Sequence, residues 1–125
     1  MLFRSRKLHD TAEEVFDAIF KILKPGTMPA EVVDASAPVE AAGFTICDDL
    51  MHGHCGAYLP PIVGSKSRPA GTIPDMPLQA GMTIVIQPNV ITPDKRAGVQ
   101  TGELLHITET SVERLHNAPP GFLRV

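Results

Sequence analysis

A run of β-branched residues near position 84 is the clearest pattern in the chain. Thr83, Ile84, Val85 and Ile86 follow the turn residue Gly81 and come before Gln87-Pro88. β-Branched side chains favour an extended backbone, glycine permits a tight turn, and proline lacks the N–H that a strand ladder needs. The pattern therefore predicts a strand between about residues 82 and 87.

Two stretches before this strand have helical periodicity. Thr11-Ala12-Glu13-Glu14 has the spacing of a capping box and predicts a helix that starts there and ends at Pro25-Gly26. A second helix is expected from about Pro29 to Ala42, with a kink or a late start at Pro38. Apolar residues at three- and four-residue steps give the first helix a buried stripe, made by Val15, Phe16, Ile19, Ile22 and Leu23.

The remaining segments are shorter. Extended pieces are expected between Phe44 and Pro61, whereas residues 60–77 contain five prolines and predict a surface loop. A polar turn at 93–98 separates the central strand from further strands at 104–108 and 112–115, and the tail residues Phe122 and Leu123 are expected to dock. We predict an α+β fold, with two helices on one face of three antiparallel strands, as a single domain spanning residues 1–125.

Composition narrows the class of protein. The 125 residues are 43% hydrophobic, which suffices for one domain with a modest core. The net charge of −3 favours neither nucleic acid nor an anionic membrane as a partner. No apolar stretch has membrane-spanning length, and the basic residues 4–7 are not followed by the apolar core of a signal peptide. Two cysteines make no disulfide framework, so we expect a cytoplasmic protein.

The order of these segments resembles the C-terminal half of the creatinase, aminopeptidase P and methionine aminopeptidase family, the pita-bread metallopeptidases, which include Xaa-Pro dipeptidases. The resemblance runs from about residue 12 to 115. It rests on Leu78-x-x-Gly81-Met82 before the central strand, on Lys24-Pro25-Gly26-Thr27 between the helices, and on Gly43-Phe44. It implies half of a pita-bread fold, in which two helices pack on a curved antiparallel sheet.

The resemblance also locates three of the five ligand positions that hold the family's two divalent metals, such as Mn, Co or Zn. The histidine position falls on His52 or His54, with His52 slightly preferred. Gln87 stands where the family has the glutamate of Glu-Pro, and Gly102 stands where it has a second glutamate. The other two ligands are aspartates of the family's first half, which have no counterpart here.

These replacements predict a degenerate site without a metal cofactor. Gln87 keeps the shape of glutamate but not its charge, so it can neither bridge two cations nor act as a general base. Glu103 lies one residue past the ligand position, and in a strand it would point to the opposite face. The family's second, substrate-contacting histidine would fall on Leu59 or Pro61. A ligand pocket would then be formed by His52, His54, Tyr58, Gln87 and Gln100.

The other histidines and the cysteines give weaker indications. His52 and His54 alternate along the chain and have Cys47 and Cys55 near them, but this spacing does not match structural zinc patterns. His106 is expected on a sheet face. His9 and His116 are expected in solvent.

Two functions follow from the resemblance. In the first, the chain is a binding or assembly module without metal-dependent catalysis, with a peptide or small molecule as the class of ligand. It would act as a homodimer, or with a partner chain that supplies the missing half. In the alternative, that missing half completes an active metallo-aminopeptidase or Xaa-Pro dipeptidase, which is an amide hydrolase.

Overall fold

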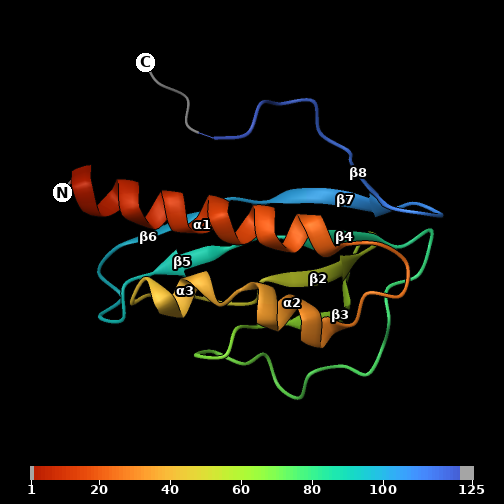
Figure 1. Ribbon diagram of the computed structural model, residues 1–125, viewed down its shortest axis with the longest axis horizontal. Coiled ribbons are helices and arrows are strands. Elements are labelled where there is room, and N and C mark those ends of the chain that lie inside the picture. Colours follow the sequence, from red (N-terminus) through yellow and green to blue (C-terminus); the bar gives the residue numbers. More distant parts are fainter. Residues whose placement is uncertain (1, 122–125) are drawn as a thin grey trace.

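Three helices lie on one side of two antiparallel sheets in the computed structural model, which describes residues 2–121 (Figure 1). The helices are α1 (Leu2–Ile22), α2 (Pro29–Ala35) and α3 (Pro38–Ala41). The five-stranded sheet has the order β3 (Tyr58–Val63), β2 (Met51–His54), β4 (Thr83–Ile86), β7 (Glu103–Ile107) and β8 (Val112–Arg114). The smaller sheet has the order β1 (Thr45–Ile46), β5 (Asn89–Ile91) and β6 (Gly98–Gln100). An α+β fold with helices on antiparallel sheet is thus confirmed.

The core lies between α1 and the strands that it crosses. Ile84 and Ile86 of β4 are fully buried, whereas Thr83 and Val85, which alternate with them, are only half-buried. Because side chains alternate across a strand, one face of the sheet carries the core and the other stays open. Further fully buried contributions to the core come from Ala12, Val15, Ile19, Leu105 and Ile107.

The first helix starts earlier than predicted. It begins at Leu2 rather than Thr11, and the Thr11 hydroxyl donates to the Lys7 carbonyl at 2.8 Å instead of capping a helix end. Its apolar stripe extends backward through Leu8, which is 1% exposed, and this burial supports the additional turns. His9 lies on those turns and is 7% exposed, so the expectation that it lies in solvent was wrong.

The second predicted helix is two short helices. α2 ends at Ala35, and Pro38 occupies the first turn of α3, where a missing N–H costs little. The capping contact that the sequence suggested at Thr11 has its counterpart here. The Met28 backbone N–H donates to a Glu31 carboxylate oxygen at 2.7 Å.

The strands at 82–87, 104–108 and 112–115 are confirmed as β4, β7 and β8, but three strands was too few. β5 begins directly after Pro88, although the sequence predicts that the extended segment ends at this proline. β3 contains Pro60 and Pro61, inside the predicted loop; it is an edge strand, where a residue without an N–H is tolerated. β1, β2 and β3 are the short extended pieces expected between Phe44 and Pro61.

The rest of the predicted loop does lack helices and strands. It is nevertheless held against the core, because Leu78 is 1% exposed and exchanges two backbone hydrogen bonds with the turn after α1. Those bonds run from Gly26 N to Leu78 O (2.8 Å) and from Leu78 N to Thr27 O (2.9 Å). The predicted docking of Phe122 and Leu123 falls outside the described residues. Within residues 2–121, no helix is both long and apolar enough to cross a bilayer.

Candidate functional site

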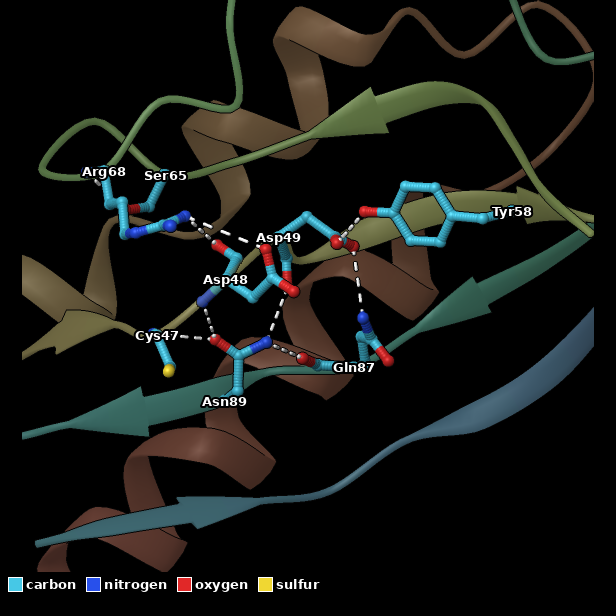
Figure 2. Close-up of polar contacts among 8 residues, drawn as sticks. All are labelled: Cys47, Asp48, Asp49, Tyr58, Ser65, Arg68, Gln87 and Asn89. Carbon is cyan, nitrogen blue, oxygen red and sulfur yellow. Dashed lines mark hydrogen bonds and ion pairs between the residues drawn. The ribbon is translucent and has the colours of Figure 1, made fainter.

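A buried carboxylate, Asp49, is the centre of a polar cluster beside the end of β4 (Figure 2). Its side chain has no exposed surface. The Tyr58 hydroxyl donates a short hydrogen bond to Asp49 Oδ2, and the Gln87 amide donates to Oδ1 at 3.3 Å. Gln100 extends the chain by donating to Gln87 Oε1 at 3.4 Å. Asp49, Tyr58, Gln87, Gln100 and Asn89 are referred to below as the Asp49 cluster.

Asn89 fixes the backbone around Asp49. This side chain is 6% exposed, and its Oδ1 accepts hydrogen bonds from the backbone N–H groups of Cys47 and Asp48, at 2.8 Å each. Its Nδ2 donates to the carbonyls of Asp49 (2.6 Å) and Gln87 (2.9 Å). The connection between β1 and β2 is thereby tied to the connection between β4 and β5, as Figure 2 shows.

Arg68 reaches the same connection from the long loop. Its Nη1 donates to the Asp48 carbonyl at 3.1 Å and lies 3.9 Å from Asp48 Oδ1 (Figure 2). The loop is held further by Ser67, whose backbone N–H and hydroxyl donate to a Glu40 carboxylate oxygen at 3.0 and 2.7 Å. The Asp49 cluster is therefore bordered by the loop as well as by the strands.

The two candidate histidines lie next to this cluster. The His52 ring is 4.2 Å from the Tyr58 ring and 6.3 Å from the His54 ring, measured between centroids. His52 is 7% exposed, and its Nδ1 is 2.8 Å from the Gly53 carbonyl oxygen. Gly53 is required by the packing of β2 on β3, because a Cβ there would lie 2.4 Å from the Pro60 carbonyl oxygen. The structure thus brings the five predicted pocket residues into one neighbourhood.

Tyr58 is held in its neutral form. Desolvation of the hydroxyl raises the pKa of Tyr58, and the hydrogen bond to Asp49 and the charges of Asp49 and Asp48 raise it further. A neutral phenol is a hydrogen-bond donor, which is what a carboxylate without exposed surface needs. The pair is therefore a stable donor and acceptor across ordinary pH.

Gln87 and Gly102, the two positions that the family resemblance assigns to glutamate ligands, converge in space. A Cβ added at Gly102 would lie 3.3 Å from the Gln87 Cβ and 3.1 Å from the Ile86 carbonyl oxygen, so a side chain at 102 would start beside Gln87. Glu103 points elsewhere, as expected. Both of its carboxylate oxygens are bound by Arg114, through Nε and Nη2. It does not join the Asp49 cluster.

These donors do not fit a two-metal site. At the converging positions the chain offers a neutral amide and a glycine, and both Asp49 oxygens already accept hydrogen bonds. Cys47 and Cys55 are exposed free thiols. Over residues 2–121 no group of three or more His, Cys, Asp or Glu side chains is arranged to hold a metal ion. Two close divalent cations need bridging negative charge, which this arrangement does not supply.

Sequence reasoning missed Asp49 and Asn89. Asp49 lies in the short connection between β1 and β2, and Asn89 is the first residue of β5, directly after Pro88. Their partners are far away in sequence, 38 residues for Asp49 with Gln87 and 42 for Asn89 with Cys47. The signal in the sequence that could have identified them is that Asp48-Asp49 and Asn89 are polar residues beside otherwise apolar strands.

Comparisons with known proteins agree with this fold. The model of metallopeptidase family M24 matches residues 3–109. The structure is similar to prolidase from Pyrococcus furiosus, with a TM-score of 0.71 and 22% identity, over 94% of this chain and 34% of that one. It is also similar to methionine aminopeptidase from Rickettsia prowazekii (TM-score 0.69, 17% identity, 90% of this chain and 52% of that one). It is similar as well to X-Pro aminopeptidase from Thermotoga maritima, with a TM-score of 0.68 and 19% identity, over 93% of this chain and 32% of that one.

The chain spans about half the length of that methionine aminopeptidase and about a third of the two other proteins. No curated protein sequence matches it. The structural likenesses show that it shares the fold of a pita-bread half-domain, and the family model covers most of its sequence. This chain belongs to metallopeptidase family M24.

Proposed function

We propose that this half-domain acts in binding or assembly and does not catalyse metal-dependent peptide hydrolysis. The observation that carries the proposal is the convergence of Gln87 and Gly102, the two positions where the family resemblance calls for glutamates. The backbone still brings these two positions together, but neither residue carries a negative charge. The Asp49 cluster uses its polar groups on one another instead.

The open face of the five-stranded sheet is the ligand surface in this proposal. It carries the rings of His52 and Tyr58, and the amides of Gln87, just after β4, and of Gln100, on β6 of the smaller sheet, adjoin it. Such a surface offers aromatic stacking and the remaining hydrogen-bonding capacity of the two amides, which suits a peptide or a small polar molecule. Prolidase and aminopeptidase names belong to the similar structures, and Xaa-Pro peptides are therefore the first ligands to test.

Metal analysis tests the proposal directly. We expect protein purified without chelator to hold far less than one equivalent of Mn, Co or Zn per chain. Gln87→Glu combined with Gly102→Glu restores two carboxylates and should give weak metal binding at most. The other donors remain absent, so multiple-turnover cleavage of a Xaa-Pro peptide is not expected.

A double variant of His52→Gln and His54→Gln is the matched control, because it removes donors without adding charge. Two metal equivalents on the unmodified chain, with metal-dependent cleavage of a Xaa-Pro peptide, would overturn the proposal. That result would favour the active amide hydrolase completed by a partner chain. Binding of an uncleaved Xaa-Pro peptide without metal would support a binding role.

We also propose that the chain forms a homodimer through the β8 edge of the five-stranded sheet. The other edge, β3, contains Pro60 and Pro61 and pairs poorly, since proline has no N–H. Beside β8, Leu115 is 49% exposed and adds apolar surface. Antiparallel pairing of two β8 strands about a twofold axis would cover the unpaired edge of β8 and the exposed Leu115 side chain.

Light scattering coupled to size exclusion at micromolar concentration measures this. We expect a mass near twice 13.4 kDa. Val112→Pro, which removes an N–H of β8 that faces away from β7, should shift the mass toward the monomer. A mass of 13.4 kDa for the unmodified chain at all concentrations contradicts the homodimer and leaves a different partner chain as the assembly route.

A further inference from the structure

A second concave region lies on the helix side of the five-stranded sheet, and its lining meets the Asp49 cluster at Gly102. It is a cavity of about 640 Å³ between α1, the start of β7, β8 and the segment 116–121. Figure 1 shows that this C-terminal segment runs above β7. Gly121 comes close to α1, because a Cβ there would lie 3.2 Å from Glu13 Oε1. The volume falls within the usual range for small-molecule sites, of roughly 300–1,000 Å³.

Two aromatic rings form the apolar wall of the cavity. Phe16 and Phe20 project from α1 with ring centroids 6.0 Å apart and planes 19° from parallel. Neither belongs to the fully buried core, which on this helix is made by residues one position away. Their half-buried faces therefore border the cavity, and aromatic faces attract cations as well as apolar groups.

The charged groups around the cavity are mainly acidic. The Glu103 carboxylate is neutralised by Arg114, whose Nη2 also donates to the Ala118 carbonyl at 3.1 Å. Glu13 and Asp17 add two more carboxylates on α1. Among residues 2–121 no lysine or arginine lies within ion-pair distance of either, although His9 Nε2 is 3.7 Å from Glu13 Oε1. The lining thus contains three carboxylates, those of Glu13, Asp17 and Glu103, and one guanidinium, that of Arg114.

We infer that this cavity is a binding site for a small organic ammonium ion with an apolar body. The ammonium group would lie between Glu13 and Asp17, and the apolar body would pack on Phe16 and Phe20. Carboxylates and aromatic faces both favour a cation, and together they discriminate against neutral and anionic analogues of the same shape. The site is independent of the proposed role of the open sheet face.

Phenethylamine is a suitable probe, with phenethyl alcohol and phenylacetate as its neutral and anionic counterparts. We expect phenethylamine to bind in the millimolar range and to shift the backbone amide NMR signals of α1 around residues 13–20. Glu13→Gln with Asp17→Asn should weaken binding about fivefold, since solvent screens charges at exposed and half-buried positions. Glu14→Gln, on the same helix but outside the cavity, should leave the affinity unchanged.

Three results would each overturn the inference. One is equal binding of phenethylamine and phenethyl alcohol. Another is an unchanged affinity in the Glu13→Gln, Asp17→Asn variant, whose substituted side chains are polar and partly or fully exposed, so that it should fold. The third is a set of shifted signals on β2 and β4 instead of α1, which would assign the probe to the Asp49 cluster.

Discussion

The two faces of the five-stranded sheet differ in what they require of the sequence. On the helix side, the inward residues of β4 and β7 have no exposed surface: Ile84, Ile86, Leu105 and Ile107. On the open side, the same strands carry half-buried residues of mixed chemistry: Thr83, Val85, Leu104 and His106. His106 pairs there with Glu113, 3.1 Å away. One face determines the stability of the fold, and the other is free to change chemistry.

This difference means that the fold can accept different groups at the positions of Gln87 and Gly102. Neither residue belongs to the buried apolar core that packs under α1. The exception is Asn89, which stands at the boundary and bonds to four backbone groups. The positions of Asp49 and Gln87 beside the open face therefore depend on the hydrogen bonds that Asn89 makes to the backbone.

The largest effect should come from a cavity on the covered face. Ile84→Ala removes buried carbons from a site with no exposed surface and should cost about 3 kcal/mol of unfolding free energy. Val85→Ala, its neighbour on the open face, should cost less than about 1 kcal/mol. Urea unfolding of both variants measures the contrast. Equal losses would mean that the open face is covered in solution.

A somewhat smaller effect is expected from the boundary. Asn89→Ala leaves two backbone N–H groups and two carbonyls without their side-chain partner and should cost about 2–3 kcal/mol. Gln100→Ala is the control, because it removes one 3.4 Å hydrogen bond from an exposed residue. Urea unfolding of the two variants measures both losses of unfolding free energy. If the two variants were equally stable, Asn89 would not be the link between the two connections.

The residues of the covered face were predictable from sequence because apolar residues recur there at regular intervals. Val15 and Ile19 in α1 and the run at 83–86 repeat at the spacing of their own secondary structure, so local patterns identified them. The start of α1 was missed for a local reason as well. Thr11 and Glu14 fit a capping box, yet burial of Leu8 one turn earlier outweighs that preference.

The Asp49 cluster was not predictable as a cluster, because the contacts of Asp49 with Gln87 and of Asn89 with Cys47 join residues about 40 positions apart and no periodicity marks them. Gln87 and Gln100 were identified through the family resemblance. Asp49 and Asn89 were not, since neither occupies a ligand position of the family pattern. Prolines also misled the reading of strands: Pro60 and Pro61 lie within an edge strand, and Pro88 separates two strands instead of ending the extended segment.

The smallest effect, and the most specific, concerns the hydroxyl of Tyr58. Tyr58→Phe removes one hydrogen bond to Asp49 and should cost about 1 kcal/mol near neutral pH. The folded-state pKa of Tyr58 is raised above its usual value of 10.0, so the unfolded chain loses this proton first. The stabilisation is therefore complete below about pH 10 and declines as the pH rises toward the folded pKa.

The stability difference between the unmodified chain and Tyr58→Phe should accordingly be constant at neutral pH and shrink above about pH 10. Tyr58 is the one tyrosine in a chain without tryptophan, so the ultraviolet absorbance of tyrosinate reports its titration directly. Asp49→Asn removes the negative charge that helps to raise the pKa and should bring the absorbance transition back toward that of free tyrosine. An unshifted transition in the unmodified protein would mean that the phenol is not bound to Asp49, and the open face would then have no buried carboxylate held by Tyr58.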